Sequence, residues 1–298
     1  MAMSLALQFK SSTNVPVSVR GILPEKIAGL STRQVAKLPI WLGNRQLPLG
    51  DLFDVRSIAA ESTSSPEDDN QDIEPVDNIV WHGDLSSVHW LGAEMQSGRM
   101  LVEGNLGRHL GSQMAGGEIV VTGSVGDWAG CEMSGGRIDI GNNAGDWLGA
   151  AYPGTKSGTD RGVITVGGDA GSGVGFALRR GWICVAGSVQ RLAGWNMLAG
   201  TIVVGRSAGP MAGKGMVRGS LVLPSREHAD GNRSALPPSF LTGAVFNQPV
   251  IGMTRNWLKK LAVDIDIPTD CEFQLFHGDQ LAGGRGEILI AAKAKKSV

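Results

Sequence analysis

The sequence is poor in the residues that build disulfide frameworks and large aromatic cores. It contains three cysteines, one tyrosine and seven phenylalanines among 298 residues. Cys131, Cys184 and Cys271 are scattered, odd in number and form no CxxC pair, so a disulfide framework is not expected. This cysteine usage is typical of a protein of the reducing cytoplasm.

The chain also lacks a strong charge of either sign and long apolar runs. Its formal net charge is -1, so no broad excess of lysine and arginine exists to neutralise phosphates, and nucleic-acid binding is not expected. There is no run of about 18 apolar residues and no signal-type apolar segment at the N-terminus. The sequence therefore predicts a cytoplasmic protein that does not act at a membrane.

Glycine is abundant and periodic. The chain has 44 glycines, and those that close successive repeats are 19, 19, 26, 19, 19 and 19 residues apart: Gly98, Gly117, Gly136, Gly162, Gly181, Gly200 and Gly219. A second glycine column has the same spacing: Gly92, Gly111, Gly130, Gly149, Gly175, Gly194 and Gly213. One repeat therefore carries an insertion, within residues 150–161.

A short apolar strand follows each closing glycine. Its alternate positions are aliphatic in every repeat: Met100, Ile119, Ile138, Ile164, Ile183, Ile202 and Leu221, and two residues later Val102, Val121, Ile140, Val166, Val185, Val204 and Leu223. Period two places both columns on one face, the inside. Further interior walls are predicted from a methionine-rich column (Met95, Met114, Met133, Leu178, Met197, Met216) and a column of smaller residues (Leu106, Val125, Ala144, Ala170, Val189, Ala208). Short strands at a fixed period predict an all-β fold, a β-solenoid of about seven 19-residue coils.

The middle strand position points outward and is apolar at both ends of the repeat region. The column reads Leu101, Val120, Asp139, Thr165, Cys184, Val203 and Val222. A solvated face should be more polar, so we expect a cover, either the chain's own tails or another subunit. The tails are favoured, because an uncapped solenoid aggregates.

The chain divides into four regions by composition. We predict an N-terminal capping region (residues 1–60), an acidic linker (61–78), the glycine repeat (79–223) and a C-terminal capping region (224–298). Ser31 and Gln34 match a capping box at the start of a short helix. The C-terminal region offers an amphipathic helix over residues 254–262 and strands over 272–277 and 287–290.

Catalytic residues are not expected in this chain. The histidines have no metal-ligand spacing with cysteine, aspartate or glutamate: His82, His89, His109, His228 and His277. Strings such as GSVGDWAG resemble phosphate-binding loops but recur as turns without a following helix. No serine lies in a nucleophile elbow.

Exposed aromatic residues form the most interesting column. Trp90, His109, Trp128 and Trp147 share a register, and Arg108, Asp127 and Asp146 precede the last three. Stacked Asp127 and Asp146 need solvent, Arg108 or a partner's cation. Two interpretations are open: a structural ladder on a solvated edge, or a partner surface made by Trp90, His109, Trp128, Trp147 and Arg108, since tryptophan and arginine are enriched in interfaces.

Three segments resemble a known family. The run LPIWLGNRQLPLGDLFDV, the repeated MxGGxIxVxGxxG and the closing FHGDQLAGGRGEILI together resemble the C subunit of formylmethanofuran dehydrogenase and its bacterial counterpart, the C subunit of the formyltransferase/hydrolase complex. The resemblance covers nearly the whole chain. The glycine repeat alone also resembles the C-terminal domain of the large subunit of glutamate synthase, but 298 residues leave no room for that enzyme's amidotransferase and flavin domains.

The resemblance implies a right-handed parallel β-helix that serves as a non-catalytic scaffold subunit. Its partners would be an amidohydrolase-like A subunit, a B subunit and a formyltransferase D subunit. The complex would act with tetrahydromethanopterin and a methanofuran-type carrier in the oxidation of formaldehyde to formate. The TRNWLKKL segment and the acidic linker look more like the bacterial members.

Other functions are open or excluded on specific grounds. One alternative is the C subunit of a tungsten or molybdenum formylmethanofuran dehydrogenase, and another is a free-standing β-helix scaffold or binding module. A hexapeptide-repeat acyltransferase has 18-residue coils and needs a catalytic histidine, so the 19-residue unit does not fit it.

The resemblance further implies a carrier whose tail can be rich in glutamate. Basic residues in and after the insertion would either contact that tail or be ordinary surface charge: Lys156, Arg161, Arg179 and Arg180.

Overall fold

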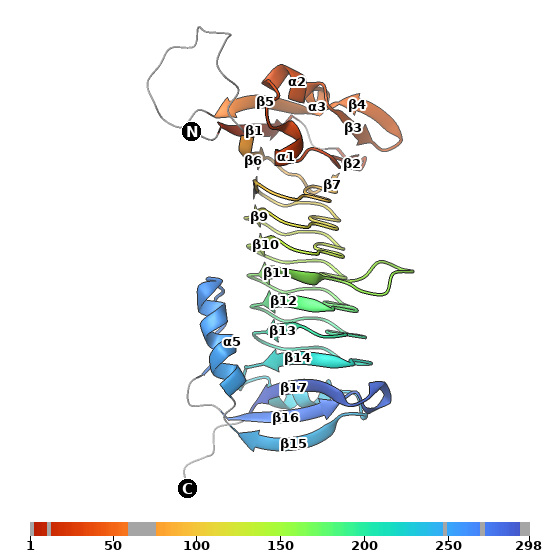
Figure 1. The fold of residues 1–298 in the computed structure, drawn as a ribbon, viewed down its shortest axis with the longest axis vertical. Helices are drawn as coiled ribbons and strands as arrows, with labels where there is room; N and C mark the ends of the chain where they lie inside the picture. Colours follow the sequence, from red (N-terminus) through yellow and green to blue (C-terminus); the bar gives the residue numbers. More distant parts are fainter. Residues whose placement is uncertain (1–2, 11–12, 59–75, 247–248, 269–271, 293–298) are drawn as a thin grey trace.

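A computed structural model describes residues 3–10, 13–58, 76–246, 249–268 and 272–292. The strands stack along the long axis of an elongated molecule (Figure 1). Most of the predicted acidic linker lies outside the described residues, and its last part, residues 76–78, begins a strand.

Each glycine repeat contributes one strand to a parallel ladder. The strands are β8 (Arg99–Glu103), β9 (Glu118–Val121), β10 (Arg137–Ile140), β11 (Asp160–Val166), β12 (Arg180–Val185), β13 (Thr201–Val204) and β14 (Arg218–Leu223). The predicted register is confirmed, because Met100 lies opposite Ile119 and Ile138 lies opposite Ile164 across the insertion. A second series of parallel bridges links Leu106, Val125, Ala144, Ala170, Val189 and Ala208.

The predicted interior columns form the core. Both aliphatic columns and the methionine-rich column are at most 2% exposed. Burying each such side chain is worth roughly 1.5–3 kcal/mol before conformational entropy is counted. The repeat is therefore held by side chains that stack on their equivalents in the neighbouring repeats.

Strands from both ends of the chain extend the same sheet. At one end, β1 (Met3–Phe9) pairs parallel with β6 (Val76–His82) and antiparallel with β5 (Phe53–Ile58). At the other end, β17 (Arg285–Ala291) pairs parallel with β14 and antiparallel with β16 (Phe273–Gly278), which pairs with β15 (Leu241–Phe246). The result is a 13-stranded sheet in the order β15-β16-β17-β14-β13-β12-β11-β10-β9-β8-β6-β1-β5.

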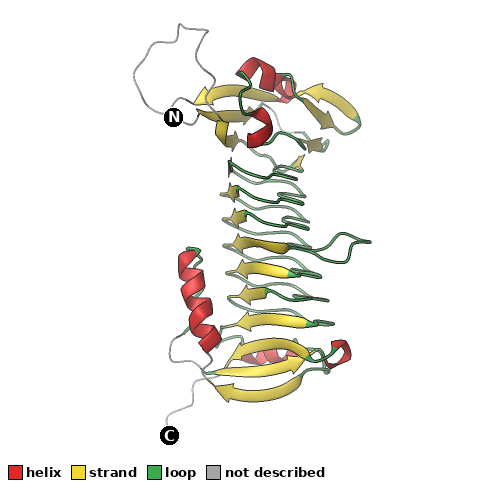
Figure 2. Ribbon diagram, viewed as in Figure 1, coloured by secondary structure: helices red, strands yellow, loops and turns green. Residues whose placement is uncertain are grey.

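A smaller sheet and several helices complete the described fold (Figure 2). The small sheet has the order β4 (Arg45–Pro48), β3 (Pro39–Leu42), β2 (Val17–Ser18), β7 (Val88–His89). The helices are α1 (Pro24–Ile27), α2 (Thr32–Ala36), α3 (Leu49–Leu52), α4 (Ala229–Ser234), α5 (Pro249–Lys260) and the 3-10 helix η1 (Gln280–Ala282). The capping box of Ser31 and Gln34 is confirmed at α2, whereas α5 begins at Pro249, earlier than predicted.

The predicted fold class, an all-β right-handed parallel β-helix of about seven coils with small mixed capping segments at both ends, is wrong. The structure is a 13-stranded mixed sheet with an additional four-stranded sheet. The antiparallel strands β5, β15 and β16 belong to the same large sheet as the repeat strands, so repeat and ends are continuous. The glycine period describes only the residues that recur. It carries no information on end strands, which join the sheet through backbone hydrogen bonds.

The chain's own C-terminal segment covers part of the outer face of the large sheet. Cys184, Val203 and Val222 are at most 1% exposed. They share a buried cluster with residues of α5 and the segment after it: Ile251, Leu258, Leu261, Ile265 and Ile267. Leu101 and Val120, in the same outward column, are only half-buried. The cover therefore reaches the last repeats and stops before the first ones.

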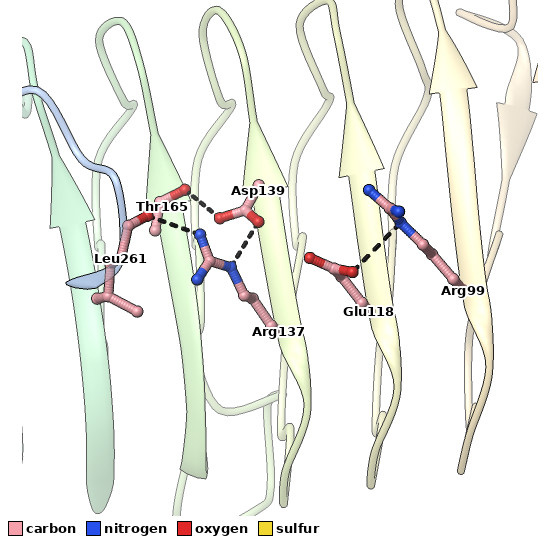
Figure 3. A network of polar contacts seen from close by, with 6 residues as sticks. All are labelled: Arg99, Glu118, Arg137, Asp139, Thr165 and Leu261. Carbon is pink, nitrogen blue, oxygen red and sulfur yellow. Dashed lines mark hydrogen bonds and ion pairs between the residues drawn. The ribbon is translucent and has the colours of Figure 1, made fainter. Parts of the chain in front are cut away.

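A polar network marks the point where this cover ends (Figure 3). The guanidinium of Arg137 donates to a carboxylate oxygen of Asp139 at 2.6 Å and to the carbonyl of Leu261 at 2.7 Å. Asp139 also accepts a 2.6 Å hydrogen bond from the hydroxyl of Thr165. Arg137 thus ties the end of α5 to the sheet.

Candidate functional site

The predicted aromatic column forms one edge of the repeat region. Trp90, His109, Trp128 and Trp147, together with Tyr152, Phe176 and Trp195 described below, are termed the aromatic strip. The four column residues have φ between 62° and 65°, a left-handed conformation that is uncommon for residues other than glycine. The rings of Trp90 and His109 stack at 4.0 Å between centroids, and those of Trp128 and Trp147 at 5.3 Å. The column therefore consists of two stacked pairs of half-buried rings.

Tyr152 of the insertion folds back onto this column. Its ring stacks on Trp128 at 5.3 Å between centroids. Its hydroxyl lies 2.7 Å from both Nδ1 of His109 and Oγ of Ser112. The sequence locates the insertion but does not predict where Tyr152 lies, because the direction of a loop is not encoded in a repeat. Tyr152 thus holds the base of the insertion against the aromatic strip.

The strip continues into later repeats through a neighbouring column that sequence reasoning missed. Phe176 lies edge-on to Trp147 at 5.9 Å, and Trp195 lies 4.7 Å from Phe176. The equivalent positions in earlier repeats hold small residues: Ala93, Ser112, Cys131 and Ala150. The change from small to aromatic residues in this column of the sequence could have identified Phe176 and Trp195.

The aromatic strip carries no charge near neutral pH. Burial, with smaller contributions from His89 and Arg108, lowers the pKa of His109 to about 4. Burial also lowers the pKa of His89, whose Nδ1 accepts the backbone N–H of Arg108 at 2.8 Å. A neutral imidazole can stack on Trp90 without bringing a charge into the strip.

The column beside the strip is a structural ladder. An Asp127 carboxylate oxygen accepts the backbone N–H of Asp146 at 2.9 Å, and Asp146 accepts that of Ser172 at 2.6 Å. Each aspartate therefore bonds the next repeat instead of requiring a partner's cation. Arg108 is 63% exposed at its side chain and lies 4.0 Å from Asp127, so it remains accessible beside the strip.

Only some of the basic residues predicted to contact a carrier lie close together. Nε of Arg179 and Nε of Arg180 lie 3.9 and 3.7 Å from the carboxylate of Asp160. Arg161 is exposed and follows Asp160 on β11. Lys156 is also exposed, on the insertion that extends from the sheet edge in Figure 1, and no interaction joins it to the described arginines.

Metal-ligand clusters and membrane-spanning helices are not found among the described residues. His82 pairs with Glu103 at 2.9 Å. Across the described ranges, no group of three or more histidine, cysteine, aspartate or glutamate side chains could hold a metal ion. Within the same ranges, every helix is too short or too polar to cross a membrane.

Curated proteins match part of the chain. No protein-family model matches it. The C subunit of the tungsten-containing formylmethanofuran dehydrogenase 2 of Methanothermobacter marburgensis is 31% identical over 101 residues, which is 34% of this chain and 33% of the relative. The C subunit of the molybdenum-containing formylmethanofuran dehydrogenase 1 of Methanosarcina barkeri is 33% identical over 101 residues, which is 34% of this chain and 30% of the relative. The matched part spans about a third of these relatives.

A solved structure matches nearly the whole chain. The crystal structure of the formyltransferase/hydrolase complex from Methylorubrum extorquens, in complex with methylofuran, contains a chain that is 30% identical and superposes with a TM-score of 0.83. The match covers 97% of this chain and 99% of that chain. This chain therefore belongs to the family formed by the C subunit of formylmethanofuran dehydrogenase and its counterpart in the formyltransferase/hydrolase complex.

Proposed function

We propose that this chain is the non-catalytic scaffold C subunit of a formyltransferase/hydrolase-type complex. The complex would act with tetrahydromethanopterin and a methanofuran-type carrier in the cytoplasmic oxidation of formaldehyde to formate. One observation carries the proposal: the match to a chain of the Methylorubrum extorquens complex extends over 97% of this chain. The catalytic groups would then belong to an amidohydrolase-like A subunit, a B subunit and a formyltransferase D subunit.

A second candidate is the C subunit of a tungsten or molybdenum formylmethanofuran dehydrogenase. The names of the partial relatives favour it, but those matches cover about a third of each protein. Affinity purification of the native complex separates the two candidates. Recovery of the A, B and D subunits with formyl transfer and hydrolysis, and without tungsten or molybdenum, supports the first proposal. Stoichiometric tungsten or molybdenum supports the second. In either case we expect no turnover from the isolated chain.

We infer that the aromatic strip, with Arg108, contacts another subunit. Its rings are half-buried and stacked, so they offer broad apolar area at little further cost in side-chain entropy. Tryptophan, tyrosine and arginine are the residues that most often anchor interfaces. The adjacent ladder of Asp127 and Asp146 is already satisfied by backbone N–H groups. A partner could therefore cover the strip without leaving those carboxylates unpaired.

The test is the double variant Trp128→Glu, Trp147→Glu. It would place two unpaired charges in the contact, each with an effective penalty of several kcal/mol. We expect copurification of the partner subunits to fail while the isolated variant melts near the wild type. Trp41→Glu is the matched control, because Trp41 is 47% exposed on β3 and is not part of the aromatic strip. Normal assembly of the double variant would assign the strip to solvent, and a collapsed melt would assign it to the fold.

We further propose that Arg161, Arg179 and Arg180, with Lys156, contact the acidic tail of a methanofuran-type carrier. All four are exposed, and the pairs of Arg179 and Arg180 with the carboxylate of Asp160 are long, at 3.9 and 3.7 Å. Binding of synthetic oligoglutamate to the purified complex tests this directly. The variant Arg179→Ala, Arg180→Ala should weaken binding, whereas Arg33→Ala, on α2, should leave it unchanged. Equal binding by both variants would contradict the assignment.

A further inference from the structure

We propose that the turn containing η1, at the C-terminal end of the large sheet, is a second docking site for a partner protein. In it, Leu281 enters an apolar pocket with an acidic rim on a neighbouring subunit of different sequence. The inference rests on the proposed function, in which this chain is one component of a complex. It concerns residues that the aromatic strip and the basic insertion do not include.

Leu281 is an apolar side chain held in water by a well-fixed turn. It is 90% exposed, more than any other large apolar residue in the described ranges. The preceding Asp279 is 3% exposed, and its carboxylate accepts the backbone N–H groups of Leu281 at 3.0 Å and Gly215 at 2.9 Å. The carbonyl of Asp279 accepts from Ala282 at 2.9 Å and from Gly284 at 2.8 Å. An ordered, projecting leucine can bind a pocket without first losing loop entropy.

Exposed cations surround this turn. Arg218 on β14 lies directly opposite Arg285 on β17, and both are exposed. No carboxylate of the described chain forms an ion pair with either arginine, and like charges facing one another across strands are unfavourable. Lys214, next to Gly215, is exposed as well. At the same repeat position two repeats earlier, Arg180 does have a partner, since its Nε lies 3.7 Å from the carboxylate of Asp160. Carboxylates from a partner would supply the missing charge.

The same charges argue against a second copy of this chain as the occupant. A twofold contact brings identical patches together, so Arg218 and Arg285 of one copy would face the same arginines of the other. Met211, 41% exposed on the adjacent repeat, adds apolar area near Lys214, to which it is joined by a 3.2 Å backbone hydrogen bond. The patch therefore fits a partner with an apolar centre and an acidic rim.

The experiment uses the complex copurified from cells that express all its subunits. Leu281→Glu should lower about tenfold the recovery of the neighbouring subunit, as expected for a central apolar anchor. The double variant Arg218→Glu, Arg285→Glu should lower it by a similar factor, and about 0.5 M salt should weaken the wild-type contact because the rim is electrostatic. Controls are Met253→Glu, 71% exposed on α5, and Arg45→Glu, exposed on β4. Both controls should assemble normally.

The outcomes separate this inference from the proposed function. Full assembly of the Leu281 and arginine variants overturns the docking site while leaving the scaffold role intact. Equal loss in the controls also overturns it, because the effect would then not belong to this patch. Recovery of the wild-type chain without any partner subunit would overturn both the scaffold role and the docking site. Thermal melts of the isolated variants should match the wild type, since every substituted side chain is exposed.

Discussion

The two halves of the outer sheet face use the same repeat in opposite environments. In the later half, Val203 and Val222 are at most 1% exposed beneath α5 and the segment after it. In the earlier half, Leu101 and Val120 occupy the same column and are only half-buried. The repeat fixes which residues point outward. A segment distant in the sequence decides which of them meet water.

The border between the two halves is polar. Asp139 and Thr165 replace aliphatic residues in the outward column, and Arg137 joins them to the carbonyl of Leu261 (Figure 3). A buried carbonyl at the end of a helix needs a donor, because intrahelical partners are missing there. The change of environment therefore coincides with the hydrogen bonds that the helix end requires.

The largest expected effect breaks the repeat itself. Gly117→Val, in the first half, should destabilise the fold by about 3 to 5 kcal/mol, because a left-handed β-branched residue is strained and its Cβ also overpacks the site. A Cβ at Gly117, where φ is +84°, would lie 2.6 Å from Met95 and 2.7 Å from the carbonyl of Gly98. Gly200→Val, in the second half, should cost less, since the nearest atoms are 3.1 Å away.

Urea unfolding of both variants provides the measurement, with Gly154→Val as control. Gly154 has φ +93°, and a Cβ added there would meet no atom within 4 Å. Its substitution should cost only the conformational strain, about 1–2 kcal/mol. Equal stability of all three variants would contradict the packing of the glycine columns.

A second change separates the covered half from the uncovered one. Val203→Asp should lower the free energy of unfolding by about 3 kcal/mol, because it places a polar group beneath α5 without a partner. Val120→Asp, in the same column, should cost less than about 1 kcal/mol because water reaches it. The comparison uses urea unfolding at pH 7. Similar losses at both sites would show that the repeat, and not the C-terminal cover, sets the environment.

The border network predicts a smaller effect. Arg137→Ala removes the donors to Asp139 and to the Leu261 carbonyl and should destabilise the fold by about 1–2 kcal/mol. Arg99→Ala, the matched control, should cost at most about 0.5 kcal/mol, because its pair with Glu118 is exposed. Hydrogen exchange should become faster in α5 for Arg137→Ala alone. Unchanged exchange would show that apolar packing suffices to hold the helix end.

The smallest effect is a pH dependence on the aromatic edge of the first half. The folded-state pKa of His109 is about 4, below its ordinary value of 6.5, so the unfolded chain binds the proton more readily. Stability should therefore fall as pH falls from about 6.5 to 4, by about 1–2 kcal/mol after allowance for partial exposure. His109→Gln should flatten this part of the profile in urea unfolding at several pH values. A variant as pH-sensitive as the wild type would assign the effect to other groups.

Sequence and structure agree where side chains repeat and differ where the backbone alone decides. The glycine columns predicted that Ile138 lies opposite Ile164 despite the insertion, because aliphatic residues recur at each strand. They did not predict that β17 lies beside β14, which brings Arg285 next to Arg218. Strand pairing at the ends uses main-chain groups common to all residues. Tyr152 was unplaced for a related reason, since its stacking depends on the path of a non-repeating loop.

The edge strands of the large sheet give the molecule a set length. Both β5 and β15 run antiparallel to their neighbours, so the parallel ladder does not continue unchanged at either end. With 13 strands, the two edges lie about 58 Å apart at about 4.8 Å per step. The number of strands therefore sets the distance between the two end surfaces of the sheet. Adding one glycine-closed repeat would move one end by the spacing of a single strand and leave both end surfaces unchanged.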